Sequence, residues 1–308
     1  MTTWHLWTAV ALLSWGIWAV LSKVLGDALT AEQSQALSTL GILPVVAYFA
    51  ISVARRNELK GASQKGIFLT FFGGVVSCIG NLAYYGALAR GEKVATVVSL
   101  TALYPVTTIL LAMIFLRERL NRIQFAGIAL SFAAIWLFNV QGDGGLFSRT
   151  VAYAIAPILL WGLSGFLQKV ATNLLPTESA SLIYLGAFVP VGLYLALAHP
   201  WPATISPRVW VVVLSLGFFL AFGNFALLAA YARGGKAAVL APVTGLYPVI
   251  SVPLAVLLLD EKIGAREIIG IALALVSVVA LSFESPTASE TIPTSTSTST
   301  TPKRETHS

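Results

Sequence analysis

The stretch LYPVTTILLAMIFLRERL, residues 103–120, returns in altered form as LYPVISVPLAVLLLDEKI, residues 246–263. Both segments begin with Leu-Tyr-Pro-Val and end near a glutamate that is followed by a basic residue, and they lie 143 positions apart. Hydrophobicity alone does not reproduce such polar landmarks at a fixed spacing. We therefore interpret the two segments as copies within an internal repeat.

The repeat extends over most of the chain. At the same offset of 143, the matching positions are Asn81 with Asn224, Arg90-Gly91 with Arg233-Gly234, Lys93 with Lys236, and Thr101 with Thr244. Towards the N-terminus the offset becomes 146, and the matching positions are Trp15-Gly16 with Trp161-Gly162, Lys23 with Lys169, Pro44 with Pro190, and Tyr48 with Tyr194. We predict a first repeat over residues 1–140 and a second over residues 141–283.

The composition places both repeats in a membrane. Of the 308 residues, 57% are hydrophobic and 10% are charged, and the mean hydropathy is +0.83, whereas a soluble domain carries about 25% charged residues. Ten apolar stretches suit a bilayer-crossing helix, which needs about 20 residues and satisfies its own backbone hydrogen bonds in lipid. They cover residues 4–25, 34–53, 66–89, 94–116, 123–140, 151–171, 179–198, 209–232, 237–259 and 266–283. The predicted fold is an all-α integral membrane protein with ten transmembrane helices.

The two five-helix repeats are expected to have inverted topology. Because five is odd, the second repeat must enter the membrane from the side opposite to the first. Such folds place a binding site near the middle of the bilayer between the halves and expose it to each side in turn. The connectors agree with inversion, since residues 117–122 carry three arginines whereas residues 260–265 carry two acidic residues and one lysine.

The basic residues predict which way the chain faces, because Lys and Arg concentrate in cytoplasmic connectors. With the N-terminus in the cytoplasm, the cytoplasmic connectors hold nine Lys and Arg, against six on the opposite side. The first residues, MTTWHLW, lack the basic start of a secretory signal, so we expect the first span to be retained. We predict a bacterial inner membrane, cytoplasmic termini, and a disordered Ser/Thr-rich cytoplasmic tail over residues 284–308.

Several functional classes do not fit these patterns. The basic residues lie in short clusters between apolar runs, which is not the basic patch of a nucleic-acid binder. The one cysteine, Cys78, lies in an apolar run and is expected to be a small buried hydrophobe. We find no metal motif, no paired catalytic carboxylates and no nucleophile with a base. We therefore expect no enzyme activity, cofactor or metal, and as partners only a small-molecule substrate and the lipid bilayer, with the chain a monomer or weak homodimer.

The first-helix segments bring a family into view. WGIWAVLSK (15–23) and WGLSGFLQK (161–169) resemble the first-helix signature of the drug/metabolite transporter superfamily, EamA type. The two Leu-Tyr-Pro-Val stretches resemble its fourth-helix signature, an apolar helix that ends on a glutamate. The resemblance implies a ten-helix basket with both termini cytoplasmic, and traffic in small metabolites, often the export of amino acids or related compounds.

Candidate site residues come from polar and aromatic side chains in the middle of the predicted spans. Trp15 and Trp161 lie far from the interfaces that tryptophan prefers, so we interpret them as walls of a substrate cavity or, alternatively, as core packing beside Gly16 and Gly162. Asn81 and Asn224 lie about 13 Å from their helix ends. Since buried amides need partners, they bind either substrate or neighbouring helices.

Further candidates surround these four. Tyr84 and Tyr85 follow Asn81 by one helical turn, where the second repeat has Leu227 and Leu228, so we expect a cavity lined unequally by the two halves. Trp18 and Tyr247 are further aromatic candidates for the lining of the cavity. Lys23 and Lys169 end their helices and either meet a substrate carboxylate or extend to the headgroups.

Prolines inside the spans suggest a gate. Pro105, Pro242 and Pro248 each remove a backbone N–H and kink a helix, and they lie near Thr101 and Thr244. We expect freed carbonyls there to line the cavity and hinge a gate, or the kinks to be static curvature, with residues 237–259 the most broken. Four more prolines lie in spans: Pro44, Pro157, Pro190 and Pro253.

The positions of the acidic residues bear on whether transport is coupled to proton movement. None of the thirteen lies in the central third of a predicted span, so proton coupling through an intramembrane carboxylate is not expected. Glu118 and Glu261 are flanked by Arg119 and Lys262, and we expect interfacial ion pairs there.

These observations together predict a transporter that moves small amphipathic metabolites, most of all amino acids, by alternating access and in the direction of export. The alternative is a transporter for nucleotide sugars or lipid-linked sugars, which would need several intramembrane Lys or Arg for the phosphates. A channel would need a carbonyl filter or a ring of charges, and a non-transporting sensor would need a soluble interaction domain. For the phosphates we find only Lys23 and Lys169, both near span ends, and we find no carbonyl filter, ring of charges or soluble domain in the sequence.

Overall fold

The computed structural model describes residues 3–26, 28–116, 121–139, 149–233, 237–281 and 283. These residues form thirteen helices and no strand, which confirms the predicted all-α fold. The helices are α1 (Thr3–Gly26), α2 (Ala31–Arg56), α3 (Gln64–Ala89), α4 (Val94–Thr101), α5 (Tyr104–Leu116), α6 (Arg122–Asn139), α7 (Arg149–Thr172), α8 (Thr177–Gly186), α9 (Phe188–Ala198), α10 (Pro207–Ala232), α11 (Ala237–Thr244), α12 (Pro248–Leu259) and α13 (Ala265–Leu281).

Eight segments of the described chain are long and apolar enough to cross a bilayer. Two of them are interrupted spans, Val94–Phe115 across α4 and α5, and Thr177–Ala198 across α8 and α9. A shorter apolar segment covers Arg122–Leu137 in α6, and α13 has 17 residues. The count of ten transmembrane helices therefore stays a prediction. The predicted tail, and the predicted ion pair of Glu118, lie outside the described residues.

Three of the predicted spans are broken rather than continuous. The breaks lie at residues 102–103, at residue 187 and at residues 245–247, and each comes shortly before a proline. Pro248 is the first residue of α12, where its missing N–H costs nothing. The longest break lies in the segment that has three prolines. Pro44 and Pro157, by contrast, lie inside the unbroken helices α2 and α7.

Contacts at the helix ends define two opposite sides of the bundle. On one side, which we call the Glu58 side, residues 57–63 meet 173–179, and Ser179 Oγ donates to Glu58 Oε2 at 2.8 Å. On the other, the Glu261 side, residues 90–93 meet 260–264, and Lys93 Nζ donates to the Lys262 carbonyl at 2.9 Å. The connectors 28–30 and 199–206 belong to the Glu261 side, where Gln33 Nε2 donates to the Pro200 carbonyl at 2.7 Å.

The repeats are inverted, as the odd helix number predicts. Asn121, which begins the fifth helix of the first repeat, donates from Nδ2 to the Phe283 carbonyl at 2.6 Å. The matching connector of the second repeat, residues 260–264, lies at the other end of α13. Equivalent connectors of the two repeats therefore emerge on opposite sides.

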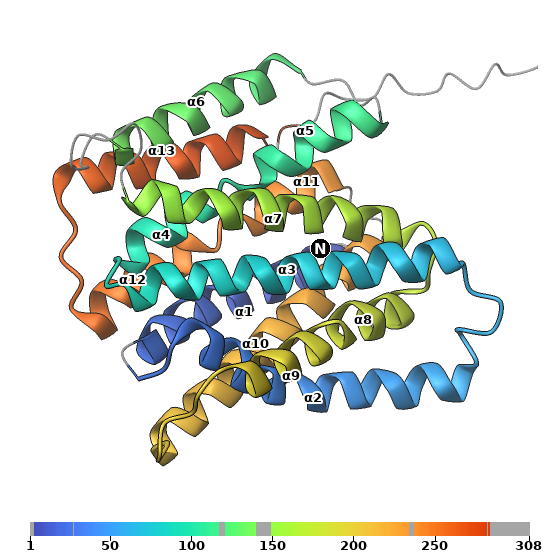
Figure 1. Ribbon diagram of the computed structural model, residues 1–308. Helices are drawn as coiled ribbons and strands as arrows, with labels where there is room; N and C mark the ends of the chain where they lie inside the picture. Colours follow the sequence, from blue (N-terminus) through green and yellow to red (C-terminus); the bar gives the residue numbers. More distant parts are fainter. Residues whose placement is uncertain are drawn as a thin grey trace, which may run out of the picture.

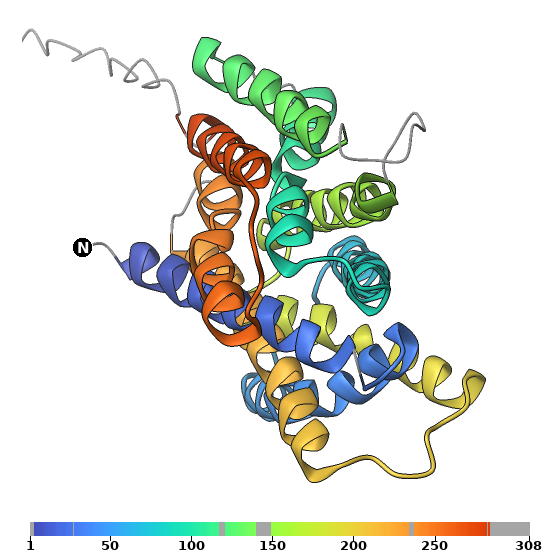
Figure 2. The same ribbon diagram turned by 90° about the vertical axis from the view of Figure 1, so that its left-hand side faces the viewer.

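The two repeats interlock through their first and third helices. α1 packs along α10, and its counterpart α7 packs along α3, so each first helix lies against the third helix of the other repeat. Figure 1 shows α5, α6 and α13 at one edge of the bundle and α2 and α9 at the other. Figure 2 shows α3 and α7 side by side, nearly end-on. The helices α1, α3, α7 and α10 thus surround the centre, where the tryptophans and asparagines of the repeats lie.

Candidate functional site

A cavity lies where the four central helices meet. It has about 590 Å³ of space free of protein atoms, the open space at its mouth included, and about 60 Å³ of that admits the centre of a water-sized sphere. Its walls are Trp15, Trp18, Ser77, Asn81, Tyr104, Trp161, Ser164, Gly165, Gln168, Tyr184, Leu220, Asn224, Leu227, Tyr231 and Tyr247. None of these described lining residues is charged.

Six of the twelve candidate substrate-binding residues line this cavity: Trp15, Trp18, Asn81, Trp161, Asn224 and Tyr247. Tyr84, Tyr85, Thr101 and Thr244 are buried but lie behind the wall. The sequence reasoning missed the other nine lining residues. Ser164, Gly165 and Gln168 stand inside the quoted segment WGLSGFLQK, so their spacing after Trp161 was an available signal.

Trp161 is held against α3 by a glycine and an asparagine. Its Nε1 donates to Asn81 Oδ1 at 3.0 Å. A Cβ placed on Gly80 would lie 2.6 Å from Trp161 Cδ1, which is too close for any real side chain. Gly80 therefore leaves the space that the indole edge occupies, and the neighbouring Asn81 binds its N–H.

The matching site in the other half has the same parts in a different arrangement. Trp15 lies over Gly223, where a Cβ would come within 2.6 Å of its Cδ1. Asn224, however, donates from Nδ2 to the Leu220 carbonyl at 2.8 Å, and among the described residues no hydrogen bond joins it to Trp15. The two halves are thus alike in sequence but not in their hydrogen bonding.

Two reciprocal hydrogen bonds cross between the repeats at the broken helices. Thr101 Oγ1 and the Tyr247 hydroxyl are 2.8 Å apart, and the Tyr104 hydroxyl and Thr244 Oγ1 are 3.0 Å apart. Since 101 matches 244 and 104 matches 247, each bond is the repeat counterpart of the other. They tie α4 and α5 to α11 and α12, so the breaks marked by Pro105 and Pro248 meet at the pseudo-two-fold axis.

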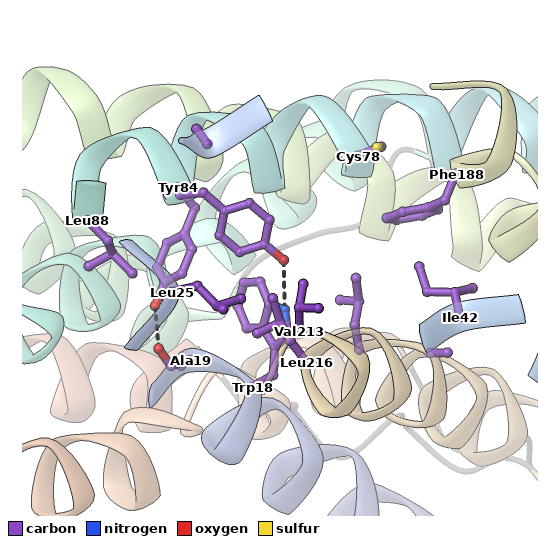
Figure 3. Packing of buried hydrophobic residues seen from close by; sticks show 14 of the residues in the cluster. Trp18, Ala19, Leu25, Ile42, Cys78, Tyr84, Leu88, Phe188, Val213 and Leu216 are labelled. Atoms are coloured by element: carbon purple, nitrogen blue, oxygen red, sulfur yellow. Dashed lines mark hydrogen bonds between the residues drawn. The ribbon is translucent and has the colours of Figure 1, made fainter. Parts of the chain in front are cut away.

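Aromatic residues close the cavity towards the Glu261 side. Trp18 stacks on Tyr84 with ring centroids 4.9 Å apart, and Trp18 Nε1 donates to the Tyr85 hydroxyl at 3.1 Å. The Tyr84 hydroxyl donates to the Ala19 carbonyl at 3.4 Å, and Figure 3 shows both bonds. Tyr84 and Tyr85 are 0% and 2% exposed. We call Trp18, Tyr84 and Tyr85 the aromatic plug.

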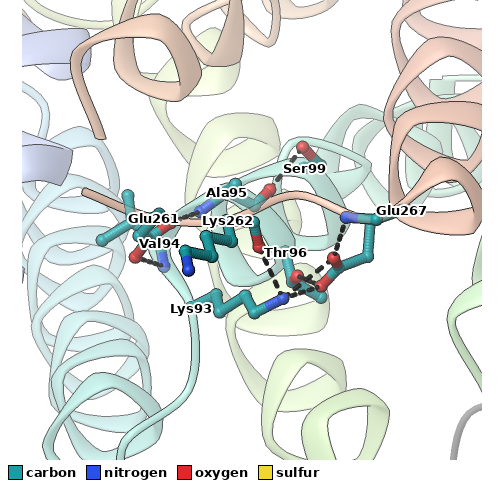
Figure 4. A network of polar contacts seen from close by, with 9 residues as sticks. Lys93, Val94, Ala95, Thr96, Ser99, Glu261, Lys262 and Glu267 are labelled. Carbon is teal, nitrogen blue, oxygen red and sulfur yellow. Dashed lines mark hydrogen bonds and ion pairs between the residues drawn. The ribbon is translucent and has the colours of Figure 1, made fainter. Parts of the chain in front are cut away.

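A polar layer lies at the helix ends of the same side, and Figure 4 shows its contacts. Lys93 Nζ lies 2.9 Å from each carboxylate oxygen of Glu267 and donates to the Lys262 carbonyl. Glu261 accepts from the backbone N–H groups of Val94 and Ala95 at 2.7 and 3.0 Å. These contacts join the start of α4 in the first repeat to the α12–α13 connector in the second.

The expected pairing of Glu261 with Lys262 is wrong. The first N–H groups of α4 have no partner within the helix, and a carboxylate at the positive end of the helix dipole is favourable. These N–H groups therefore take the carboxylate of Glu261. The ion pair on this side is instead between Lys93 and Glu267.

The cavity extends the other way, towards the Glu58 side. There its walls come from the last turns of α7 and α10, with Gln168 and Tyr231 the lining residues nearest to the helix ends. The repeat counterparts of Ser164 and Leu227 are Trp18 and Tyr84, two residues of the aromatic plug. The same repeat position thus has an aromatic ring on the Glu261 side and a serine or leucine on the Glu58 side.

The two candidate lysines lie at helix ends rather than in the cavity. Lys23 Nζ donates to the carbonyls of Leu88 and Glu92, each at 3.2 Å. Lys169 is half-buried in the last turn of α7 and does not line the cavity. Carboxylates in the described helices lie in first turns, at Glu32, Glu178 and Glu267.

Comparisons with known proteins agree with this geometry. The model of the EamA-like transporter family matches the chain twice, over residues 2–140 and 148–283. No curated protein matches the chain. Of 25 similar chains of known structure, one, described only as a crystal structure of a protein, is 20% identical, with a TM-score of 0.62 over 90% of this chain and 96% of its own. That likeness shows the fold alone.

The family match repeats once per half and spans most of the chain. It coincides with a membrane-type bundle of two inverted repeats around a central cavity. The chain is a membrane transporter that belongs to the EamA-like transporter family.

Proposed function

We propose that the protein moves small amphipathic metabolites without net charge, amino acids first among them, by alternating access through the central cavity. The observation that carries the proposal is the lining: seven aromatic side chains, three amides, two serine hydroxyls and no charged group among the described wall residues. Aromatic walls bind an apolar body, and the amides and hydroxyls orient a polar group.

The uncharged lining weighs against nucleotide sugars and lipid-linked sugars. A phosphate buried without a cation loses its hydration and gains no opposite charge. Lys23 is already bound to two backbone carbonyls, and Lys169 lies outside the lining. A zwitterionic or uncharged molecule avoids this cost, so the alternative substrate class ranks second.

Alternating access is supported by the one-sided closure. The aromatic plug and the polar layer close the Glu261 side, whereas the repeat counterparts of the aromatic plug on the Glu58 side are the smaller Ser164, Leu227 and Leu228. In an inverted repeat the two halves can exchange these arrangements, which would open the Glu261 side. The count of Lys and Arg favours a cytoplasmic Glu58 side, so this state would accept substrate from the cytoplasm, as export requires.

The lining also favours a mechanism without a carboxylate proton carrier. The wall has no Asp or Glu among the described residues, and the carboxylates within the described helices lie in first turns. We propose facilitated transport or substrate exchange in a bacterial inner membrane, with both termini cytoplasmic and the chain acting as a monomer or weak homodimer.

A thermal-shift panel tests the substrate class. Purified protein in detergent is heated with each of the twenty standard amino acids and with a set of sugar nucleotides. A ligand present at ten times its Kd stabilises the fold by about 1.4 kcal/mol, which raises Tm by about 2–4 °C for a chain of this size class. Shifts confined to sugar nucleotides would overturn the proposed class.

A further inference from the structure

The cavity contains buried polar atoms that no protein group satisfies. Among the described residues, the side-chain atoms that are fully buried and without a hydrogen-bond partner are Asn81 Nδ2, Gln168 Oε1, Tyr231 Oη and both amide atoms of Gln35. The first three belong to cavity walls, whereas Gln35 does not line the cavity. Buried polar groups are normally satisfied, so three such atoms around one cavity point to a ligand.

Gln168 and Tyr231 occupy equivalent places on two helices that face each other across the cavity. Gln168 follows Trp161 by seven residues on α7, and Tyr231 follows Asn224 by seven residues on α10. Seven residues are two helical turns, about 10 Å along the axis, so each shares a face with its partner in the central layer. Their side chains are 4% and 7% exposed. They form a second polar level on the Glu58 side of that layer.

The repeat has no such pair on the Glu261 side. The counterpart of Gln168 is Ser22, whose hydroxyl donates to the Ala19 carbonyl at 2.6 Å. The counterpart of Tyr231 is Leu88, an apolar residue that is 1% exposed. When the protein opens to the Glu261 side, the mirrored position therefore offers no unpartnered polar group.

We propose that Gln168 and Tyr231 form a hydrogen-bonding subsite that binds an N–H or O–H donor of the substrate, such as an ammonium group, on the Glu58 side only. Gln168 Oε1 can only accept, and the Tyr231 hydroxyl can accept as well. This subsite rests on the proposed function, because it assigns a role within the same cavity. It makes a donor group on the substrate a condition for tight binding.

The subsite also makes the two sides unequal. Substrate that enters from the Glu58 side gains contacts that are missing on the Glu261 side, so it half-saturates transport at a lower concentration there. In a passive carrier this difference is balanced by the equilibrium between the two conformations. The half-saturating substrate concentrations on the two sides therefore differ, but the final substrate gradient across the membrane is unchanged.

Two variants with matched controls test the proposal. Gln168→Met removes the acceptor at similar volume, and Tyr231→Phe removes one oxygen. Gln35→Met changes a buried, unpartnered amide outside the cavity, and Tyr194→Phe changes a tyrosine that is 68% exposed. The probes are L-phenylalanine and its trimethylammonium betaine, which keeps both charges but has no N–H donor. Binding is measured on purified protein by tryptophan fluorescence quenching.

Each cavity variant is expected to bind L-phenylalanine about fivefold to tenfold more weakly than wild type, the loss of roughly one hydrogen bond. Binding of the betaine should change less than twofold, and both control variants should bind both probes as wild type does. If Gln168→Met does not fold, Tyr231→Phe decides alone, because it deletes a single atom.

Two outcomes would overturn the proposal and are distinguishable. If wild type binds L-phenylalanine and both cavity variants bind it equally well, the subsite is refuted while the proposed substrate class stands. If wild type binds none of the twenty amino acids, the substrate class fails, and the donor subsite fails with it.

Discussion

Removing the Lys93 ammonium should open the Glu261 side of the protein. Lys93 Nζ contacts both oxygens of Glu267 and the Lys262 carbonyl, each at 2.9 Å, and these contacts join the two repeats. The Lys93 side chain is 43% exposed, so solvent screens the ion pair and limits its contribution to about 0.5–1 kcal/mol. The carbonyl hydrogen bond adds a similar amount.

In the variant Lys93→Met, the closed state is therefore destabilised by about 1–2 kcal/mol relative to the state open to the Glu261 side. At about 1.4 kcal/mol per factor of ten, the population of the open state rises about fivefold to thirtyfold. Glu261 still caps α4 and the aromatic plug is unchanged, so the shift is partial.

The assay is the rate at which a membrane-impermeant maleimide labels a single cysteine at Ser22, next to the aromatic plug, in a Cys78→Ser background. Reagent is added from the Glu261 side of oriented vesicles. Lys262→Met is the matched control, since it removes a positive charge from the facing connector, residues 260–264, without removing the Lys262 carbonyl or the ion pair of Lys93 with Glu267. Equal labelling rates in Lys93→Met and Lys262→Met would refute the assigned role of the polar layer.

Three further variants probe other parts of the site. Gly80→Ala should displace the Trp161 indole from Asn81 and lower the rate of amino-acid uptake by at least tenfold. The control Gly186→Ala, whose added Cβ meets nothing within 4 Å, should leave the uptake rate unchanged. Equal uptake by the two variants would show that the position of the indole is unimportant. Glu261→Ala should remove the cap from α4 and lower the free energy of unfolding by about 1 kcal/mol. A thermal scan should then show a Tm lowered by about 2–4 °C. An unchanged Tm would contradict the capping role. Tyr247→Phe should remove the hydrogen bond to Thr101 that joins the two repeats and change the balance between the two conformations, so the maleimide labelling rate at Ser22 should change by about fivefold. A wild-type rate would contradict a role of this bond in holding the observed conformation.

The sequence predicts the arrangement of the helices because polar residues at matching positions reveal the internal repeat. The pairs Trp15 with Trp161 and Asn81 with Asn224 stand at fixed offsets, and an odd number of helices per repeat makes inversion a necessity of topology. Those four residues do line the cavity, since a central tryptophan or amide in lipid needs a specific neighbour.

Which side of the protein is closed could not be predicted from the sequence in the same way. Both halves have nearly the same residues around the centre, so the sequence does not say which side is closed. That depends on differences such as Tyr84 against Leu227 and Gln168 against Ser22, whose effect appears only once packing decides which of them face the cavity. Nor does the sequence show that Glu261 caps α4, because its partners are backbone N–H groups from the other repeat.

On the proposed mechanism, substrate crosses through the uncharged cavity between the inverted repeats. Counterflow of labelled L-phenylalanine into proteoliposomes loaded with unlabelled amino acid tests it without any assumption about coupling. Wild type should accumulate label transiently, Leu227→Phe should lose this accumulation because the ring fills the cavity, and the lipid-facing variant Leu197→Phe, at a position 80% exposed, should retain it. Accumulation that persists in Leu227→Phe at the wild-type rate would contradict passage of substrate through this cavity.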